Sequence, residues 1–465
     1  MNITKYGPTE PGYIFTAPSH LVTQGGNPTI YDTDGELVWQ GPHGNMTYFR
    51  PEILHGEQVL VYWSGMATSR GFGHGAFHVL NNAYEEIYRV TLSEDEGFVS
   101  GLPGETPKSY IDVQDGFVTE RGTILVGAVN ATRIDPQQVD VPDGVEWIFN
   151  DLFYEIDIVS NRVLFRWSTL EHPEAAKPVD SLKPVGNDGK NKENPWDFMH
   201  LNGFVPYGEG YLISANFMGA LYAIGKDGAV QWKLSGLTGG DFKLGPDTQF
   251  AGQHNPRVIK QTSDTLTISV YNDAKVPNQT FISPSSGLLL DLNFTSRTVS
   301  LNRKLDDPSE PFYTESQGNC QGLDNGHFFV GRGSVPEIEE YDAKGKCVMR
   351  ATLGYEPYFW GTHTAFRLPW VGKPNTAPEV FACLSHGATM VYASWNGATD
   401  VQAWDIWTGN QGVTGEDVEY VTTVGKKGFE TEARLDGIHS TVTVKAVGGP
   451  NDERQSEHVR VRQSC

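Results

Sequence analysis

Six short clusters of histidine, amide and acidic residues hold the side chains of this sequence that are best suited to chemistry. The clusters are residues 63–65 with 73–75, residues 112–115, 199–202, 252–255, 316–319 and 361–363. A histidine in an extended segment, flanked by small or amide residues, can act as an acid, a base or a nucleophile. A single histidine is more often structural, but His or Gln recurs from cluster to cluster. This recurrence favours functional roles first for His200 and His254, and then for His74 and His363.

The segments that carry these clusters predict an all-β fold. Apolar residues at helical spacing are scarce, whereas short alternating or β-branched runs recur between turn residues. Residues 31–39, 225–232 and 341–347 repeat one strand–turn–strand pattern, because Asp, Asn and Gly accept the positive φ of tight hairpin turns. Such hairpins recur roughly every 50–75 residues, a spacing that suits repeated units of four strands.

This spacing predicts one domain over residues 1–465, a six-bladed β-propeller whose last blade is completed by strands from both ends of the chain. Seven blades are the alternative, and a pair of β-sandwiches is a competing architecture that the repeated hairpins disfavour. Two polar segments without strand signals, residues 135–146 and 171–195, are expected to form long loops over one face of the ring. The active site is expected in the axial channel, where the inner strands begin.

Charge and composition limit the partners. The chain has 35 Lys and Arg against 57 Asp and Glu, and the net charge of −22 disfavours binding to a phosphate backbone or to an anionic membrane. No apolar run reaches the length of about 18 residues that spans a bilayer. The expected partner is a small hydrophobic or aromatic molecule. No cofactor is expected, and no metal either, since the acidic clusters lack the spacing of calcium loops. The oligomeric state is left open.

Sequons and cysteines indicate the compartment. Five Asn-x-Ser/Thr sequons predict a secreted glycoprotein, and they stand at Asn2, Asn45, Asn130, Asn278 and Asn293. The first residues, MNITKYGP, contain no hydrophobic signal region, so the chain is either a mature secreted form or cytosolic, and secretion is the expectation. The four cysteines allow three connectivities, of which Cys320–Cys347 with Cys383–Cys465 is favoured.

Several motifs resemble the fungal arylsulfotransferase family, a secreted group of six-bladed propellers related to bacterial aryl sulfotransferases. They are residues 31–39, 62–65, 197–202, 253–254, 316–319, 366–370 and 391–399. The resemblance implies sulfuryl transfer through a histidine nucleophile that further histidines and an arginine assist. His254 matches the nucleophile, and His200 matches one assisting histidine. Gln114 stands where the family has the other assisting histidine, and Asn216 stands where it has the arginine.

Both replacements remove positive charge from the place where sulfate oxygens would bind. Losing one charge-assisted hydrogen bond costs roughly 1.5–3 kcal/mol, and losing one transition-state donor lowers the rate about 10²–10³-fold. The sequence therefore predicts a neutral, largely hydrophobic substrate. The resemblance implies a cyclisation in fungal secondary metabolism, such as a hetero-Diels–Alder reaction between a tropolone-type enone and a terpene alkene. Such a reaction needs proximity and hydrogen bonds to an oxygen, but no cofactor.

In this hypothesis, the catalytic residues polarise the substrate oxygen, and further residues bind the substrate. The catalytic set is Gln114, His200, Asn216 and His254. The substrate-binding set is Trp63, His74, Asn202, Phe217, Gln253, Gln317, His363 and Trp395. Two alternatives stay open. One is aryl sulfotransfer with His254 as nucleophile and a compensating cation such as Arg257 or Arg332, and the other is a non-catalytic propeller that carries a hydrophobic metabolite.

Overall fold

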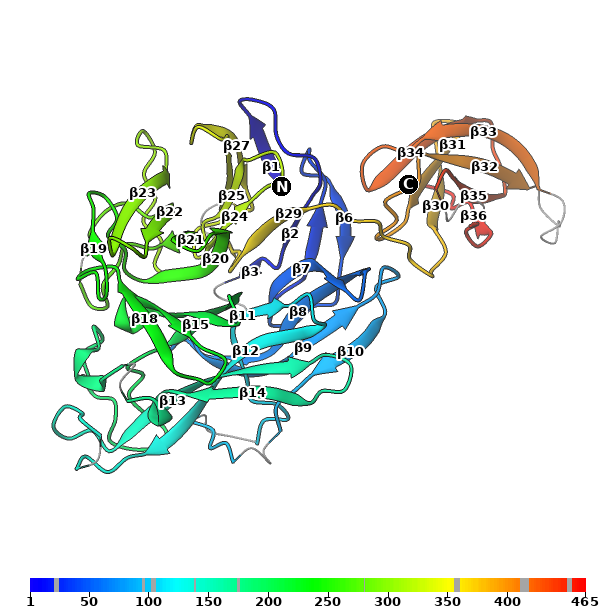
Figure 1. The fold of residues 1–465 in the computed structure, drawn as a ribbon. Coiled ribbons are helices and arrows are strands. Elements are labelled where there is room, and N and C mark those ends of the chain that lie inside the picture. Colours follow the sequence, from blue (N-terminus) through cyan, green and yellow to red (C-terminus); the bar gives the residue numbers. More distant parts are fainter. Residues whose placement is uncertain are drawn as a thin grey trace.

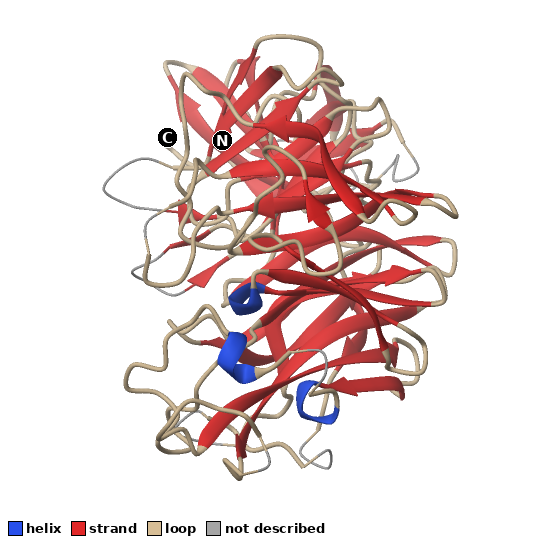
Figure 2. Cartoon of the chain, turned by 60° about the vertical axis from the view of Figure 1, so that its left-hand side comes forward, coloured by secondary structure: helices blue, strands red, loops and turns tan. Residues whose placement is uncertain are grey.

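The predicted all-β class is confirmed. A computed structural model describes residues 1–20, 25–93, 97–101, 106–137, 139–173, 176–279, 281–354, 360–409, 418–449 and 454–465. Strands dominate this part of the chain (Figure 2), and its helices are three single 3-10 turns, η2 (Thr169–Glu171), η3 (Pro178–Asp180) and η4 (Asn216–Met218). Within the same ranges, no helix is long and apolar enough to cross a membrane.

Six antiparallel units of four main strands account for most of the chain up to residue 368. Unit 1 joins β29 (Ala365–Leu368) to β2 (Tyr13–Thr16), β5 (Thr29–Tyr31) and β6 (Leu37–Gln40). Unit 2 is β7 (Met46–Leu54), β8 (Glu57–Ala67), β9 (Gly73–Leu80) and β10 (Glu86–Val90). Unit 3 is β11 (Ile111–Val118), β12 (Thr123–Arg133), β13 (Trp147–Asp157) and β14 (Val163–Ser168), and it joins unit 2 in one sheet because Ile111 pairs with Gly75.

The remaining three units continue the same meander. Unit 4 is β15 (Leu201–Tyr207), β16 (Gly210–Ala215), β17 (Ala220–Ile224) and β18 (Val230–Ser235). Unit 5 is β20 (Gln253–Gln261), β21 (Thr265–Asn272), β22 (Ser286–Asn293) and β23 (Thr298–Leu305), with β19 (Lys243–Leu244) parallel to β23. Unit 6 is β24 (Asn319–Gly322), β25 (Phe328–Gly331), β26 (Glu337–Tyr341) and β27 (Cys347–Thr352), with β1 (Asn2–Lys5) at its outer edge. A small separate sheet pairs β28 (Trp360–Gly361), β3 (Ser19–His20) and β4 (Gly25–Gly26).

The turn chemistry expected from the sequence is present in the hairpins that end units 1, 4 and 6. In the β5–β6 turn, Asp32 Oδ1 accepts the backbone N–H groups of residues 34 and 36, and Gly35 has a φ of +86°. Asp342 makes the same two bonds in the β26–β27 turn, where Gly345 has a φ of +83°. The aspartate closes the turn and the glycine supplies the left-handed backbone, so these segments fold as hairpins.

The six units follow one another around a common middle (Figure 1). The first strands of units 2 to 6 lie next to one another in the order β7, β11, β15, β20 and β24, while β29 contacts both β7 and β25. A separate cluster of buried apolar side chains fills each interface between neighbouring units, including the interface of unit 6 with unit 1. The hydrophobic cores therefore lie between the units, and the polar starts of the first strands face the middle.

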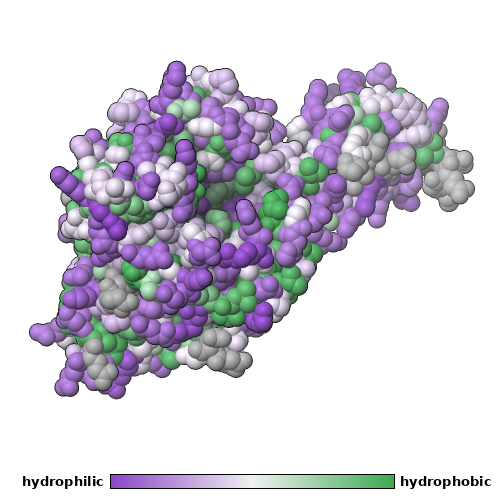
Figure 3. Space-filling view, in the orientation of Figure 1, coloured by the Kyte–Doolittle hydropathy of each residue, from purple (hydrophilic) through white to green (hydrophobic). Residues whose placement is uncertain are grey.

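The described residues between 379 and 460 form two further sheets to one side of the six units (Figures 1 and 3), which they meet through hydrogen bonds such as that from Gly397 N–H to Val38. One sheet has the order β30 (Glu379–Ser385), β31 (Ala388–Ser394) and β34 (Glu430–Asp436). The other has the order β33 (Glu419–Gly425), β32 (Ala403–Gly409), β35 (Thr441–Val447) and β36 (Val459–Arg460). They share a hydrophobic cluster of their own, built around Trp395 and Trp404. The expectation of a single domain over residues 1–465 stays a prediction, and this separate core is the feature with which to test it.

Only half of the expected disulfide pattern forms. Cys383 and Cys465 are bonded, and their bond ties the last residue of the chain to β30. Cys320 and Cys347 are free thiols, so their expected pairing is wrong. They lie on β24 and β27, which two intervening strands separate by roughly 14 Å at the usual strand spacing. A disulfide needs α-carbons within about 7 Å.

The five sequons stay predictions of glycosylation. Asn2 and Asn278 are exposed, whereas the other three asparagines are half-buried. The side chain of Asn130 accepts a hydrogen bond from the backbone N–H of Val99, and that of Asn293 accepts one from Ser296. Asn278 is the sequon that lies nearest to the site described below, because it lines the rim of its cavity.

Candidate functional site

A cavity of about 460 Å³ opens where the first strands of units 4, 5 and 6 begin. Its lining is Ser69, Arg70, Gly71, Lys183, His200, Asn216, Phe217, Gly252, His254, Asp273, Lys275, Pro277, Asn278, Glu315 and Ser316. Four residues that were singled out from the sequence therefore share one cavity, namely His200, Asn216, Phe217 and His254. They arrive from the start of β15, from η4 and from the start of β20, so the repetition of the units brings them together.

His200 is held in one orientation from both sides of its ring. Its Nδ1–H donates to Asp197 Oδ2 at 2.8 Å, and its Nε2 lies 3.2 Å from the amide nitrogen of Gln114. A Cβ on Gly71 would lie 3.3 Å from the ring, so the glycine leaves room for it. Burial alone would lower the pKa of His200, but Asp197 and two further aspartates raise it above its usual value. The neighbouring carboxylates therefore make this imidazole a stronger base than a free histidine.

His254 presents the geometry of an oriented nucleophile. Its Nδ1–H faces two acceptors, Asp273 Oδ2 and the backbone oxygen of Gly252, each at 3.0 Å. Burial raises the pKa of Asp273, while His254 and a hydrogen bond from Thr314 oppose that rise. With the proton fixed on Nδ1, the lone pair lies on Nε2, where it accepts a long bond of 3.3 Å from the backbone N–H of Gln317. A base that is itself oriented by a carboxylate is the arrangement used for nucleophilic catalysis.

The amides that were expected to polarise a substrate oxygen are bonded to the protein instead. The amide nitrogen of Gln114 donates to the backbone oxygen of Gly71 and faces His200. That of Asn216 lies 3.4 Å from the backbone oxygen of Gln253. The amide of Gln114 therefore positions His200, and Asn216 is the one of the two that lines the cavity.

Asn202 and Gln253 do not line the cavity, and neither side chain is exposed at all. The amide of Asn202 donates to the backbone oxygen of Gln253 at 2.8 Å, which ties β15 to β20. The amide of Gln253 in turn donates to Ser214 Oγ and to the backbone oxygens of Ala215 and Ala220. The sequence could not separate these amides from ligand-binding ones, since both kinds occur at the starts of inner strands.

Three cationic side chains line the cavity, and sequence reasoning missed them. The ammonium of Lys183 lies 4.5 Å from the centre of the Phe217 ring and pairs with no carboxylate of the described residues. Lys275 is ion-paired with Glu315, while Arg70 donates to the backbone oxygen of Pro195 at 2.6 Å and lies 3.4 Å from Asp188 Oδ2. All three come from loops, where a single Lys or Arg carries no positional signal. Lys183 belongs to the long polar segment 171–195 that was expected over one face of the ring.

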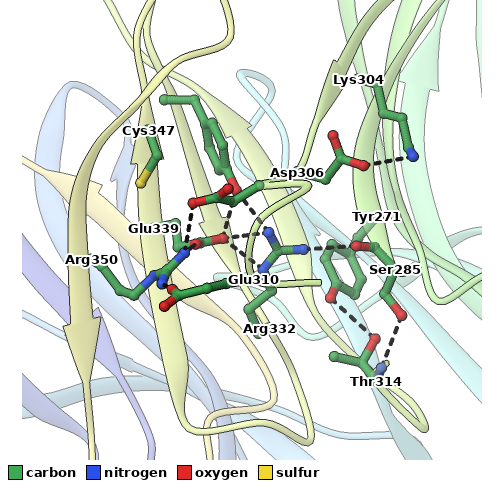
Figure 4. Close-up of polar contacts among 12 residues, drawn as sticks. Tyr271, Ser285, Lys304, Asp306, Glu310, Thr314, Arg332, Glu339, Cys347 and Arg350 are labelled. Atoms are coloured by element: carbon green, nitrogen blue, oxygen red, sulfur yellow. Dashed lines mark hydrogen bonds and ion pairs between the residues drawn. The ribbon is translucent and has the colours of Figure 1, made fainter. Parts of the chain in front are cut away.

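The arginines that were offered as compensating cations lie elsewhere, so that expectation is wrong. Arg257 is paired with the buried carboxylate of Asp115 at 2.7 Å and lines a different cavity of about 580 Å³. Arg332 is fully buried in unit 6 (Figure 4), where its guanidinium donates to Glu339 and to the backbone oxygen of Ser285. A guanidinium with its donors already used by carboxylates cannot also receive a sulfate group.

Three aromatic or histidine side chains that were expected to bind substrate lie in the protein interior. Trp63 is 0% exposed, belongs to the core between units 2 and 3, and donates to the backbone oxygen of Ile111. Trp395 packs in the separate core of residues 379–460, far along the chain from the cavity lining. His74 is buried between aromatic rings, and burial lowers its pKa to about 4. None of the three lines the cavity, since Trp63 lies within β8, His74 lies at the start of β9 and Trp395 follows β31.

His363 and Gln317 lie beside the cavity without lining it. Burial lowers the pKa of His363 to about 3, and its ring packs edge-on against Tyr48 at 4.5 Å. Gln317 contributes its backbone N–H to His254. Both residues, like Tyr48 and His200, have a positive φ between +54° and +72°. Non-glycine residues in this region cost free energy and gather at functional sites, and here they recur at the start of one inner strand after another.

The fold and the site define an all-β protein with a histidine pair in a cavity rimmed by cations. A sequence model described as arylsulfotransferase (ASST) matches residues 50–354, which is more than half of the chain. The chain belongs to the arylsulfotransferase family. A search among curated proteins finds no match.

The solved structures that match this chain have low sequence identities and low TM-scores. A protein of unknown function from Bacteroides caccae is 12% identical, with a TM-score of 0.40 over 77% of this chain and 98% of that one. An α-L-arabinanase from Penicillium chrysogenum is 11% identical, with a TM-score of 0.35 over 83% of this chain and 94% of that one.

Proposed function

We propose that the protein is a six-bladed β-propeller that transfers a sulfuryl group between phenolic compounds through His254. The six units, with one hydrophobic core at each interface, support the propeller. Membership of the arylsulfotransferase family supports the reaction class. The observation that carries the proposal is that His254, with its proton held on Nδ1, shares one cavity with three cationic side chains. Secretion, glycosylation and a fungal source stay predictions.

In the first half of the reaction, the donor is an aryl sulfate ester. The lone pair on His254 Nε2 attacks the sulfur, an N–S bond forms, and the bond between sulfur and the aryl oxygen breaks. The aryl oxygen leaves with the electron pair of that bond and takes up a proton. Asp273 stabilises the positive charge that develops on the ring. The long hydrogen bond from Gln317 must open before Nε2 can attack.

In the second half, the oxygen of an acceptor phenol attacks the same sulfur. The S–O bond forms, the N–S bond breaks, and the ring of His254 recovers its lone pair. The phenolic proton must leave at this step, and His200 is suited to receive it, since its pKa is raised above the usual histidine value. The same imidazole can return a proton to the leaving aryl oxygen in the first half.

The cations take over the role that the arginine and the second histidine have in the family. Lys183, Lys275 and Arg70 line the cavity that holds His254, and a sulfuryl group carries its negative charge on the oxygens that would face them. A hydrogen bond to a charged group contributes about 1.5–3 kcal/mol. Lys183 is the best placed of the three, because Lys275 and Arg70 share their charge with Glu315 and Asp188.

The test is transfer from a nitrophenyl sulfate to a phenol, followed by release of nitrophenolate and by mass of the sulfated product. In His254→Ala, kcat should fall about 10³-fold or more, because the covalent step is lost. His43→Ala, which changes an exposed histidine, should keep the wild-type rate. Wild-type turnover by His254→Ala would overturn the assignment of the nucleophile.

The cyclisation of a neutral enone with a terpene alkene is the second candidate. Asn216 and Phe217 favour it, because an amide and an aromatic ring line the cavity side by side. It required Gln114 and Asn216 to donate to a substrate oxygen, whereas both amides face backbone oxygens. Cyclisation by the wild type that persists in His254→Ala, without any sulfated product, would restore it. Ligand binding without turnover in either assay would favour a carrier protein.

A further inference from the structure

Three buried aspartates surround His200, and each comes from a different part of the fold. Asp112 lies on β11, Asp151 on β13, and Asp197 in the segment before β15. Their exposed fractions are 2%, 1% and 2%. The charged groups that face them are His200, Lys183 and Arg70, and only His200 is in hydrogen-bond contact with one of them. Three ionised carboxylates packed this closely would repel one another strongly.

Each aspartate uses one carboxylate oxygen to hold the backbone or the ring. Asp112 Oδ1 accepts the N–H groups of Gly73 and Val113. Asp151 Oδ1 accepts the N–H of Leu201 at 3.1 Å, one residue after His200. Asp197 Oδ2 accepts Nδ1–H of His200. These contacts fix all three side chains, so the cluster is rigid.

Two carboxylate oxygens in this cluster are buried without a hydrogen-bond partner among the described residues. They are Oδ2 of Asp151 and Oδ1 of Asp197. A buried oxygen that lacks a donor is costly. The two aspartates lie on adjoining segments, because the backbone N–H of Phe149 donates to the oxygen of Trp196 at 3.0 Å and Asp151 Oδ1 accepts from Leu201. One proton between the two orphan oxygens would satisfy both.

We propose that Asp151 carries a proton on Oδ2 and donates it to Asp197, and that this pair positions His200 for proton transfer. The inference rests on the proposed function, since it deepens the role of His200 in that reaction. Asp197 then keeps its single negative charge, accepts from Asp151 and from His200, and fixes the imidazole proton on Nδ1. Asp151 is a positioning residue because it acts through Asp197 and does not touch the cavity.

The shifted acidities agree with this division of charge. Burial, and then the neighbouring charge of Asp197, raise the pKa of Asp151 to about 8. Burial likewise raises the pKa of Asp112 to about 7. Burial alone would raise the pKa of Asp197, but His200 lowers it below its usual value. Asp197 is thus the carboxylate that stays ionised beside the imidazole.

The test uses the full chain and an infrared difference spectrum, which detects the C=O stretch of a protonated carboxyl group. At pH 7, the wild type and the surface control Asp143→Asn should show this band, and Asp151→Asn should lack part of it. The absence of any band that depends on Asp151 would overturn the proposal. This measurement does not need turnover. If the wild type transferred no sulfuryl group, the proposed function would be wrong, but the infrared spectrum would still show whether Asp151 carries a proton.

Kinetics supply the second readout. Asparagine imitates a protonated aspartate, because its oxygen can accept from Leu201 and its amide can donate to Asp197. We therefore expect Asp151→Ala to lower kcat about tenfold or more, and Asp151→Asn to recover most of that loss. The wild type should lose activity as the pH rises above about 8, where Asp151 ionises, and Asp151→Asn should keep its activity there. An Asn variant as impaired as the Ala variant would show that the ionised form works, against the proposal.

Discussion

Two regions bury charge in opposite ways. In unit 6, Arg332 and Glu339 are both 0% exposed, and every polar atom of the two side chains has a partner among the described residues (Figure 4). Arg350 donates to the second oxygen of Glu339. Around His200, by contrast, oxygens of Asp151 and Asp197 have no hydrogen-bond partner within the same described ranges.

The difference shows how to separate structural charge from functional charge. A buried ion network that satisfies all its donors and acceptors fixes one packing and has no capacity left for a ligand. A cluster with unmatched atoms next to a cavity has such capacity, at a cost in free energy that the rest of the fold must offset. This contrast explains why Arg332, which looked suitable from the sequence, is not a substrate-binding cation.

The largest expected effect on stability comes from breaking the buried ion network of Arg332, Glu339 and Arg350, called the matched network below. Arg332→Leu leaves Glu339 buried beside fewer donors, and removing one partner of a buried pair costs about 3–5 kcal/mol of unfolding free energy. Urea unfolding measures it. Arg434→Leu, at an exposed position on β34, should change the value by less than about 0.5 kcal/mol. A small loss in Arg332→Leu would mean that the network does not stabilise unit 6.

The next largest effect is expected on catalysis, at the cavity that contains His200. Lys183→Ala removes from the cavity rim a cation that has no carboxylate partner among the described residues, so kcat/KM for an aryl sulfate should fall about 10–100-fold, the equivalent of one charged hydrogen bond. The unfolding free energy should stay within about 0.5 kcal/mol of the wild type. Lys190→Ala is the matched control, because this exposed lysine belongs to the same loop. Equal kinetics for the two variants would exclude Lys183 from binding the sulfate.

The unmatched cluster should also leave a pH signature on stability. A carboxyl whose pKa is raised in the folded state binds its proton more tightly there than in the unfolded chain. Its contribution to stability is present below the unfolded pKa of about 4 and is lost as the pH rises through the folded pKa of about 8. The thermal midpoint of the wild type should therefore fall over this range, and Asp151→Asn should fall less. If the thermal midpoints of the two proteins depended on pH in the same way, Asp151 would not be protonated in the folded protein.

The smallest effect is expected at Cys347, which lies beside the matched network (Figure 4). Burial, and then the carboxylate of Glu339, raise the pKa of this thiol to about 12. The thiol therefore stays neutral and should react slowly with iodoacetamide at pH 8, while Cys347→Ser should change stability by less than about 1 kcal/mol. Rapid alkylation of the folded protein would show that the network is more open than its contacts indicate.

The sequence predicted those features that repeat from unit to unit. Alternating runs and Asp-Gly turns indicated an all-β chain, and polar residues at the starts of inner strands led to His200 and His254. What it could not supply depends on single contacts between distant segments. In the sequence, nothing distinguishes Lys183 from other loop lysines, and only the fold places it beside Phe217. Likewise, the sequence allows Cys320 to pair with Cys347, but two strands separate them in the sheet. Trp395 was misplaced because a tryptophan near a turn fits either a channel wall or a core.

Unit 1 has a consequence for how the molecule is made. Its strand β29 pairs with β2 through residues as far apart as Thr16 and Ala365, so this sheet stays incomplete until most of the chain has left the ribosome. Contacts of such long sequence separation form slowly. Meanwhile the open edge of β2 can pair with another chain. Translation pauses or chaperones that shield the first 40 residues should therefore decide the yield of soluble protein, and a chain that ends before residue 365 should aggregate rather than fold without this strand.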